Sequence, residues 1–267
     1  MSQTNSRSCF LSLRPRTRPR ARVVCFPFAG GGPTAFSSWA RALPEDIELV
    51  AAQLPGRGAA LNEKPFRRLA DVVDWITPEL EELCELPCAF FGHSLGALLA
   101  FELTRVLQKR GGRGPLHLFA SGRRAPHLPI QRVPISHLPD DQFITAIRAF
   151  NGTPRVILDD PELMALFLPA LRADLAIDES HRPMLGEPLA CPLTALGGAQ
   201  DPFVSHEQLR AWGSHARDAF ECRVFQGDHF FIKPFEASVV AMILRALEPQ
   251  GSVLENRDVR GLNQAAI

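Results

Sequence analysis

The sequence feature that most constrains the fold is Gly92-His93-Ser94-Leu95-Gly96, which lies between an apolar run and an Ala- and Leu-rich segment. This pattern is typical of a strand that turns sharply into a helix and exposes a serine hydroxyl at the turn. The glycines lack Cβ atoms, so the strand and the helix can approach closely there. Free N–H groups at the start of the helix would point at the same place. We therefore predict that Ser94 is a nucleophile; a helix-capping serine is the alternative.

Short apolar segments alternate with longer amphipathic ones along most of the chain, which indicates a mostly parallel sheet flanked by helices. The strands are expected at residues 23–28, 47–53, 88–91, 117–121, 193–196 and 222–225. The helices are expected at residues 36–43, 69–83, 96–110 and 237–246. Together with the turn at Ser94, this order predicts an α/β fold of the α/β-hydrolase type.

The segment at residues 129–188 interrupts the alternation, because it contains helical patterns and no strand pattern. Helices are expected at residues 140–150 and 161–174, followed by a turn at 178–181. A single crossover needs far fewer than about 60 residues, so we predict a helical lid over the strand ends; ordinary crossover helices are the alternative. The flanking segments 21–128 and 189–249 then form the hydrolase core.

The two ends of the chain are expected to lie outside this core. Residues 1–20 predict a basic flexible tail, because the first 44 residues contain seven arginines and no acidic residue. The Arg- and Ser-rich residues 6–22 would also suit an organelle transit peptide, but we interpret them as a solvated tail. Residues 250–267 are polar and predict a loose C-terminal tail.

A serine hydroxyl needs a base, and two loop residues are placed to form the rest of a triad. In this fold the nucleophile, the acid and the histidine follow in that order along the chain. His229 follows the last expected strand through a short turn. Asp201 follows the strand before it, and Asp228 is a rival that adjoins His229. We predict that Asp201 orients His229, which takes the proton of Ser94.

The apolar run at residues 23–28 ends in a glycine-rich loop, which occupies the position that supplies an oxyanion donor in this fold. We predict the backbone N–H of Leu95 as the first donor and that of Ala29 as the second, with Phe28 as the alternative. The loop lacks the Lys-Ser/Thr and the GxGxxG spacing of nucleotide-binding loops, so phosphate binding is not expected there.

The composition argues against several other classes of function. The formal net charge is zero, so a general attraction to nucleic acid is not expected. No apolar run approaches the roughly 18 residues of a membrane span. The six cysteines have neither zinc-site nor CxxC spacing. We therefore expect a cytoplasmic enzyme with reduced cysteines, no membrane segment, and neither a metal nor another cofactor.

Several further motifs resemble those of the type II thioesterases, the stand-alone editing enzymes of polyketide and nonribosomal peptide synthesis. They are Cys-Phe-Pro-Phe-Ala-Gly-Gly (25–31), Gln-Leu-Pro-Gly-Arg (53–57), Phe-Gly-His-Ser-Leu-Gly-Ala (91–97), Ser-Gly-Arg-Arg-Ala-Pro (121–126), Leu-Pro-Asp (138–140), Gly-Thr-Pro (152–154), Pro-Ala-Leu-Arg-Ala-Asp (169–174) and Gly-Asp-His-Phe-Phe (227–231). The resemblance covers about residues 25–234. It departs at two points: no further arginine follows Arg57 closely, and Phe28 stands where the family often has a polar or hydroxylated aromatic residue.

The resemblance implies an α/β-hydrolase with a helical lid that removes stalled or wrong acyl groups from carrier-protein phosphopantetheine. It implies the triad Ser94, Asp201 and His229, with Leu95 and Ala29 at the oxyanion positions. A short- or medium-chain acyl-CoA thioesterase, a carboxylesterase and a noncatalytic synthase-binding partner are the alternatives. We expect an acyl or peptidyl carrier protein as the partner and a monomer as the oligomeric state.

Apolar side chains of the expected lid could line an acyl channel. We predict Phe28, Phe143, Ile147 and Phe167 as substrate contacts; plain packing between lid helices is the alternative for those in the lid. Arg123 and Arg124 follow a strand, so they either form a basic rim that docks an acidic carrier protein or are simply solvated.

Overall fold

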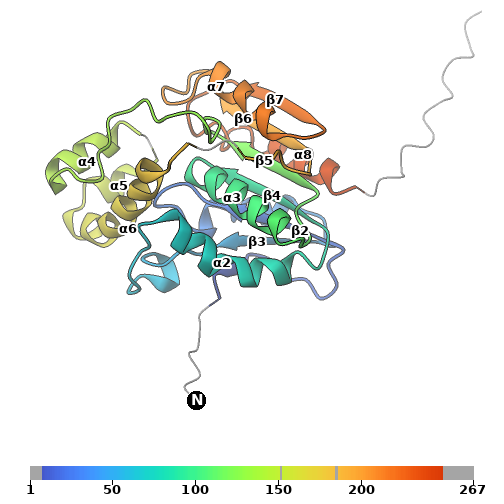
Figure 1. Ribbon diagram of the computed structural model, residues 1–267. Helices are drawn as coiled ribbons and strands as arrows, with labels where there is room; N and C mark the ends of the chain where they lie inside the picture. The colour runs from blue at the N-terminus through green and yellow to red at the C-terminus, as the bar shows by residue number, and fades with distance from the viewer. Residues whose placement is uncertain (1–7, 151, 184–185, 249–267) are drawn as a thin grey trace, which may run out of the picture.

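The computed structural model describes residues 8–150, 152–183 and 186–248, and its centre is a seven-stranded sheet (Figure 1). The strands are β1 (Phe10–Ser12), β2 (Ala21–Phe26), β3 (Ile47–Ala52), β4 (Cys88–His93), β5 (His117–Ser121), β6 (Leu193–Gly198) and β7 (Phe220–Phe225). Their spatial order is β1-β3-β2-β4-β5-β6-β7. β1 pairs antiparallel with β3, and every other neighbouring pair is parallel.

Helices cover both faces of the sheet. They are η1 (Pro33–Phe36), α1 (Trp39–Ala42), η2 (Gly58–Ala60), α2 (Leu69–Leu83), α3 (Leu95–Lys109), α4 (Asp140–Arg148), α5 (Arg155–Leu158), α6 (Pro161–Ser180), α7 (His206–Arg210), η3 (Ala211–His215) and α8 (Glu236–Ala246). In Figure 1, α2 and α3 lie in front of the sheet, and α4, α5 and α6 gather to one side of it.

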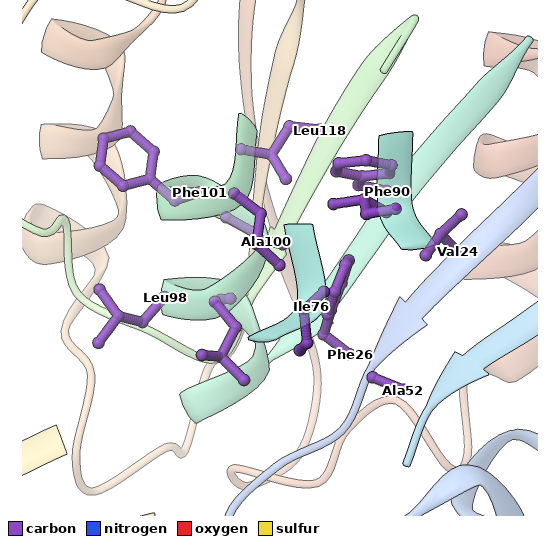
Figure 2. Close-up of a cluster of buried hydrophobic side chains, with 14 of the residues drawn as sticks. Val24, Phe26, Ala52, Ile76, Phe90, Leu98, Ala100, Phe101 and Leu118 are labelled. Atoms are coloured by element: carbon purple, nitrogen blue, oxygen red, sulfur yellow. The ribbon is translucent and has the colours of Figure 1, made fainter. Parts of the chain in front are cut away.

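The alternation of side chains along the central strands explains the two cores. Val24 and Phe26 of β2 pack against α2 and α3, together with Phe90 of β4 (Figure 2). Val23 and Cys25 point the other way and pack with α1 and α8. Successive side chains of a strand face opposite sides, and a parallel sheet buries both. The continuous apolar strands predicted from the sequence are therefore confirmed as central strands.

The prediction of a flexible tail over residues 1–20 is wrong where residues 10–12 form β1. Phe10 pairs with Ala52 at the edge of the sheet. The backbone N–H of Cys9 donates to the Glu79 carboxylate at 2.8 Å, and both Cys9 and Phe10 are buried. Residues 1–7 and the predicted C-terminal tail lie outside the described residues. A three-residue strand leaves no periodic pattern, and its partners are about 40 residues away in the sequence, so local sequence patterns could not indicate it.

Three helices, α4 to α6, occupy the chain between β5 and β6. The Asp160 side chain accepts hydrogen bonds from the backbone N–H groups of Glu162 and Leu163, which fixes the start of α6. α6 continues to Ser180, so the helix expected to end at 174 is longer and includes most of the expected turn at 178–181. A small apolar cluster holds these helices together. No helix in the described ranges is both long and apolar enough to cross a membrane.

Four histidines are held largely away from water by the core. Burial lowers the pKa of His117 and of His215 to about 4, and it lowers the pKa of His181 less strongly. His93 is completely buried, and its pKa lies well below 6.5 because of burial and the neighbouring His229. These side chains remain neutral in the folded protein at a pH where the unfolded chain binds protons.

We predict that the free energy of unfolding decreases as the pH falls from about 6.5 towards 4. Over this range the unfolded state binds more protons than the folded state, so acid favours unfolding. Burial raises the pKa of Glu102, so this group binds a proton more readily in the folded state and makes acid less destabilising. It is a single group, whereas four histidines have the opposite effect on the free energy of unfolding. Urea denaturation at several pH values measures the effect.

A His117→Gln variant provides the control, because the amide retains polar atoms facing the hydroxyl of Thr194, which lies 2.8 Å from His117 Nε2. The variant should lose stability less steeply on acidification than the wild type. A free energy of unfolding that stays constant across this pH range in the wild type would contradict the prediction.

Candidate active site

Ser94 is the single residue between the end of β4 and the start of α3. Its φ of 56° and ψ of −113° make it the one non-glycine residue with positive φ in the described ranges. Such a backbone conformation costs about 1–3 kcal/mol and persists only where the surroundings enforce it. The backbone N–H of Ser94 donates to the carbonyl of Ser121 at 2.8 Å, which continues the β4–β5 ladder up to the turn. The turn therefore presents the serine at the N-terminus of α3.

Two glycines make this turn sterically possible. A Cβ atom on Gly96 would overlap the carbonyl oxygen of Phe26, and one on Gly92 would overlap the carbonyl of Gly96. The backbone of α3 thus packs directly against the ends of β4 and β2. This confirms the close approach of strand and helix expected from the glycine spacing.

His229, which lines the same pocket as Ser94, is paired with Asp201. His229 Nδ1 is 2.7 Å from Asp201 Oδ2, and the Asp201 side chain is fully buried. The other carboxylate oxygen of Asp201 accepts the backbone N–H of Phe203 at 2.8 Å. An ionised carboxylate makes Nδ1 the protonated nitrogen of a neutral imidazole, which leaves the Nε2 lone pair free. The two loops predicted from strand order thus meet, and Ser94 and His229 line one pocket.

The other candidates near the turn have structural roles. His93 is completely buried, and its Nδ1 lies 2.9 Å from the hydroxyl of Ser121. Burial keeps the pKa of His93 far below neutral, so it is not available as a base. Asp228 accepts the backbone N–H of Phe230 at 2.8 Å and so holds the turn that carries His229.

Leu95 and Ala29 both line the pocket that Ser94 lines. Among the described residues, neither amide donates to a protein acceptor. Ala29 stands directly before Gly30, which has a φ of +75° and lets the loop after β2 turn toward the helix N-terminus. Two backbone N–H groups without a protein acceptor, from residues that line the pocket of the nucleophile, are what the predicted oxyanion hole requires.

A buried ion pair holds the loop that follows β2. This pair was not predicted from the sequence. Asp174 of α6 accepts two hydrogen bonds from the Arg57 guanidinium, at 2.6 and 2.8 Å. The same carboxylate accepts the backbone N–H of Gly30 at 2.7 Å, and Arg57 also donates to the carbonyl of Gly31 at 3.1 Å. Arg57 and Asp174 are 5% and 1% exposed. We call this pair with its two loop contacts the loop brace.

The sequence did contain a signal for the loop brace. Arg57 and Asp174 end two of the motifs that carry the family resemblance, Gln-Leu-Pro-Gly-Arg and Pro-Ala-Leu-Arg-Ala-Asp. Their opposite charges in apolar surroundings would have suggested a pair, although 117 positions separate them.

The pocket has a volume of about 280 Å³ and lies between the strand ends and the lid helices. Phe28 and Ile147 line it, as expected for substrate contacts. The structure corrects the other two predictions. Phe143 is completely buried in the lid cluster, with the Arg172 guanidinium 4.3 Å from its ring centroid, and Phe167 packs against the same cluster. Neither lines the pocket, and both pack between the lid helices, which is the alternative given for them above.

Arg123 and Arg124 are neither a surface rim nor solvated, so both earlier interpretations are wrong. Arg123 is 4% exposed, and the Arg124 side chain is 13% exposed. Both line the pocket, next to Asp178 of α6. The strand β5 delivers them there, because its carboxyl end is the edge of the sheet at which Ser94 lies.

The mostly parallel sheet, the strained turn at Ser94 and the His229–Asp201 pair define a hydrolase of the α/β class. The thioesterase domain family matches residues 21–249. The chain belongs to this family, which confirms the family predicted from the sequence motifs.

Individual relatives agree with this assignment. The chain is 38% identical over 247 residues to the gramicidin S biosynthesis protein GrsT of Aneurinibacillus migulanus, and the match covers 92% of this chain and 96% of that protein. It is 37% identical over 223 residues to the thioesterase PikA5 of Streptomyces venezuelae, with 82% and 78% covered. The solved structure of the type II thioesterase BorB from the borrelidin biosynthetic cluster matches with a TM-score of 0.83 and 32% identity, covering 89% of this chain and 97% of that one.

We predict that Asp174→Ala lowers the free energy of unfolding by about 3–5 kcal/mol, because it leaves the buried Arg57 without its counter-charge. The matched control is Asp140→Ala, which breaks the ion pair with Arg172 on the same lid. Asp140 is 69% exposed, so its loss should cost no more than about 1 kcal/mol. Urea denaturation of the two variants beside the wild type measures both values. If both variants lose the same free energy of unfolding, the loop brace stabilises the protein no more than an exposed ion pair does.

Proposed function

We propose that this enzyme hydrolyses acyl thioesters on the phosphopantetheine of an acyl or peptidyl carrier protein, and that Ser94 forms an acyl-enzyme intermediate. The observation that carries the proposal is the strained turn at Ser94 in one pocket with the buried His229–Asp201 pair. The relatives support the substrate class, because one is a gramicidin S biosynthesis protein and another is a type II thioesterase from the borrelidin biosynthetic cluster.

The first half of the reaction acylates the serine. His229 Nε2 takes the proton of the Ser94 hydroxyl as its oxygen attacks the thioester carbonyl. The Asp201 carboxylate holds Nδ1–H and stabilises the imidazolium that forms. The negative oxygen of the tetrahedral intermediate binds the free N–H groups of Leu95 and Ala29, each worth about 3 kcal/mol. The thiolate leaves and takes up the proton of the His229 imidazolium, which returns His229 to its neutral form. The departure itself needs little acid assistance, because thiols have much lower pKa values than alcohols or amines.

The second half frees the serine. Water enters as the nucleophile, His229 removes its proton, and the acyl group leaves as a carboxylic acid while Ser94 regains its proton from the imidazolium. The free thiol of the carrier protein is restored. Removal of stalled or wrong acyl groups from a polyketide or nonribosomal peptide synthase is the role that this chemistry serves.

The lid at residues 129–188 selects the acyl group in this proposal. Ile147 and Leu171 form part of the apolar wall opposite Ser94, and an apolar lid keeps competing water out of the site. We further propose that the enzyme acts as a monomer in the cytoplasm. The six cysteines are free, which suits a reducing compartment, and the thiols of Cys84 and Cys88 stay unbonded although their sulfur atoms are 3.4 Å apart.

The relatives do not favour the alternative functions. An acyl-CoA thioesterase or a carboxylesterase would use the same triad. The relative rates on carrier-bound, CoA-bound and oxygen-ester substrates therefore distinguish these alternatives from the proposed function. A noncatalytic synthase-binding partner would have no need for a strained serine in one pocket with a histidine that is hydrogen-bonded to a fully buried aspartate.

We predict that Ser94→Ala lowers the hydrolysis rate of an acyl carrier protein by roughly four to six orders of magnitude, because the triad acts as a unit. Intact-protein mass spectrometry follows loss of the acyl group from carrier proteins loaded with acetyl and longer chains. Acyl-CoA and oxygen esters of the same chains are compared in parallel. Ser214→Ala, at an exposed position outside the pocket, should leave the rate unchanged.

Two results would contradict the proposal. If folded wild-type enzyme hydrolyses none of the carrier-bound chains, the substrate class is wrong. If Ser94→Ala retains most of the rate, the nucleophile is wrong, and labelling by an organophosphate would then identify the reacting side chain.

A further inference from the structure

One guanidinium that lines the pocket has no closely bound anion. The Nε of Arg124 donates to the carbonyl of Leu128 at 3.3 Å, and its Nη1 lies 4.0 Å from Asp178 Oδ1. Its terminal nitrogens make no hydrogen bond to another side chain in the described part of the structure. Burial and the neighbouring Arg123 lower the pKa of Arg124 to about 10, which still leaves it charged at neutral pH. Its donors are therefore available to a ligand in the pocket.

The neighbouring arginine is also incompletely neutralised. Arg123 Nη1 is 2.7 Å from Asp178 Oδ1. Its Nε and Nη2 are buried and have no hydrogen-bond partner among the residues that the structure describes. A buried cation that uses only part of its donors adds to the positive potential on this side of the pocket.

The local charges do not cancel. Arg132 forms ion pairs with Asp178 at 3.0 Å and with Glu179 at 2.7 Å. Three cations, Arg123, Arg124 and Arg132, therefore share these two carboxylates. Glu102 also interacts with Arg123 but is paired with Arg105, so one positive charge remains in excess. His181 faces the same group, but burial and Arg123 lower its pKa, so it adds no charge at neutral pH. The excess matches a ligand with a single negative charge.

These arginines line the same pocket as Ser94 and His229. Arg124 is two residues from Gly122, so their Cα atoms are at most about 8 Å apart. A Cβ on Gly122 would be 3.3 Å from the His229 ring. A row of rings connects the other side: Phe203 is 5.6 Å from His229, Phe150 is 5.0 Å from Phe203, and the Arg132 guanidinium is 5.5 Å from Phe150. Ser94, these phenylalanines and the three arginines all line the same pocket.

We infer that Arg124, with the charge of Arg123 and Arg132 behind it, binds a carboxylate at the far end of the acyl group, so that the enzyme prefers ω-carboxyacyl thioesters over neutral acyl thioesters of equal length. The inference rests on the proposed function and names its substrate class. A planar guanidinium offers paired donors that match a carboxylate. The phosphodiester of the carrier arm is also a monoanion, but the whole pantetheine chain separates it from the thioester, whereas Arg124 lies beside the loop that contacts His229.

The test compares glutaryl and pentanoyl thioesters, which have the same chain length and differ in the terminal carboxylate. Each acyl group is presented on N-acetylcysteamine, which lacks the phosphodiester, and on a phosphopantetheinyl carrier protein. The measured quantity is the ratio of kcat/KM for glutaryl to kcat/KM for pentanoyl, after subtraction of uncatalysed hydrolysis. We expect the wild type to prefer glutaryl on both thiols, and Arg124→Gln to lower the ratio roughly tenfold or more through KM.

Arg148→Gln is the matched control, because this lid arginine is exposed, pairs with Asp159 and does not line the pocket. It should leave the ratio and both rates unchanged. Arg124→Lys keeps the charge but loses the planar pair of donors, so it should give an intermediate ratio, and it replaces Arg124→Gln if thermal unfolding shows that the latter does not fold.

The remaining outcomes overturn the inference in distinguishable ways. If pentanoyl is hydrolysed and the ratio is the same in wild type and Arg124→Gln, the carboxylate subsite is wrong while the proposed function stands. If Arg124→Gln weakens both acyl groups equally, and only on the carrier protein, the arginine binds the phosphodiester instead. If the wild type hydrolyses neither thioester on either thiol, the proposed function fails and the inference fails with it.

Discussion

The helix that follows Ser94 packs directly against the end of a neighbouring strand, because Gly96 has no Cβ to meet the carbonyl of Phe26. This contact brings the N-terminus of α3 to the ends of both β4 and β2. Leu95 and Ala29, which come from separate segments, consequently line one pocket with Ser94. The strain at Ser94 is tolerated because the flanking strand and helix are both in the buried core, where shifting either one would open cavities.

The loop brace adds a second constraint, which connects the lid to the oxyanion loop. Asp174 belongs to α6, yet it binds the amide of Gly30 next to the proposed oxyanion donor. A movement that carried this part of α6 outward would break hydrogen bonds between buried charged groups, which is costly. The α4 and α5 helices are held to the rest of the lid by an apolar cluster and by two ion pairs with exposed members, Arg148–Asp159 and Arg172–Asp140. An outward movement of α4 and α5 would therefore separate no fully buried ion pair, whereas a movement of α6 would separate Arg57 from Asp174.

The parts of the fold and site that the sequence predicted are those with local signatures. The turn at Ser94 has its strand, glycines and helix within one short segment, and His229 and Asp201 could be placed because strand order fixes which loops share an edge of the sheet. The features that the sequence did not predict depend on distant partners. β1 pairs with a strand about 40 residues away, Arg57 meets Asp174 across 117 positions, and the inward orientation of Phe143 follows from how the lid helices pack together.

The excess positive charge beside the pocket affects the reaction as well as the choice of substrate. The tetrahedral intermediate gains a negative oxygen, which the field of Arg123 and Arg124 favours, whereas the imidazolium that forms on His229 is disfavoured by the same field. The fully buried Asp201 offsets the second effect, since it lies 2.7 Å from His229 Nδ1 while the arginines act from further away. A carboxylate bound at Arg124, as inferred above, would neutralise the excess charge and so weaken both effects. Oxyanion stabilisation then rests on the backbone amides that the close packing of α3 and β2 positions.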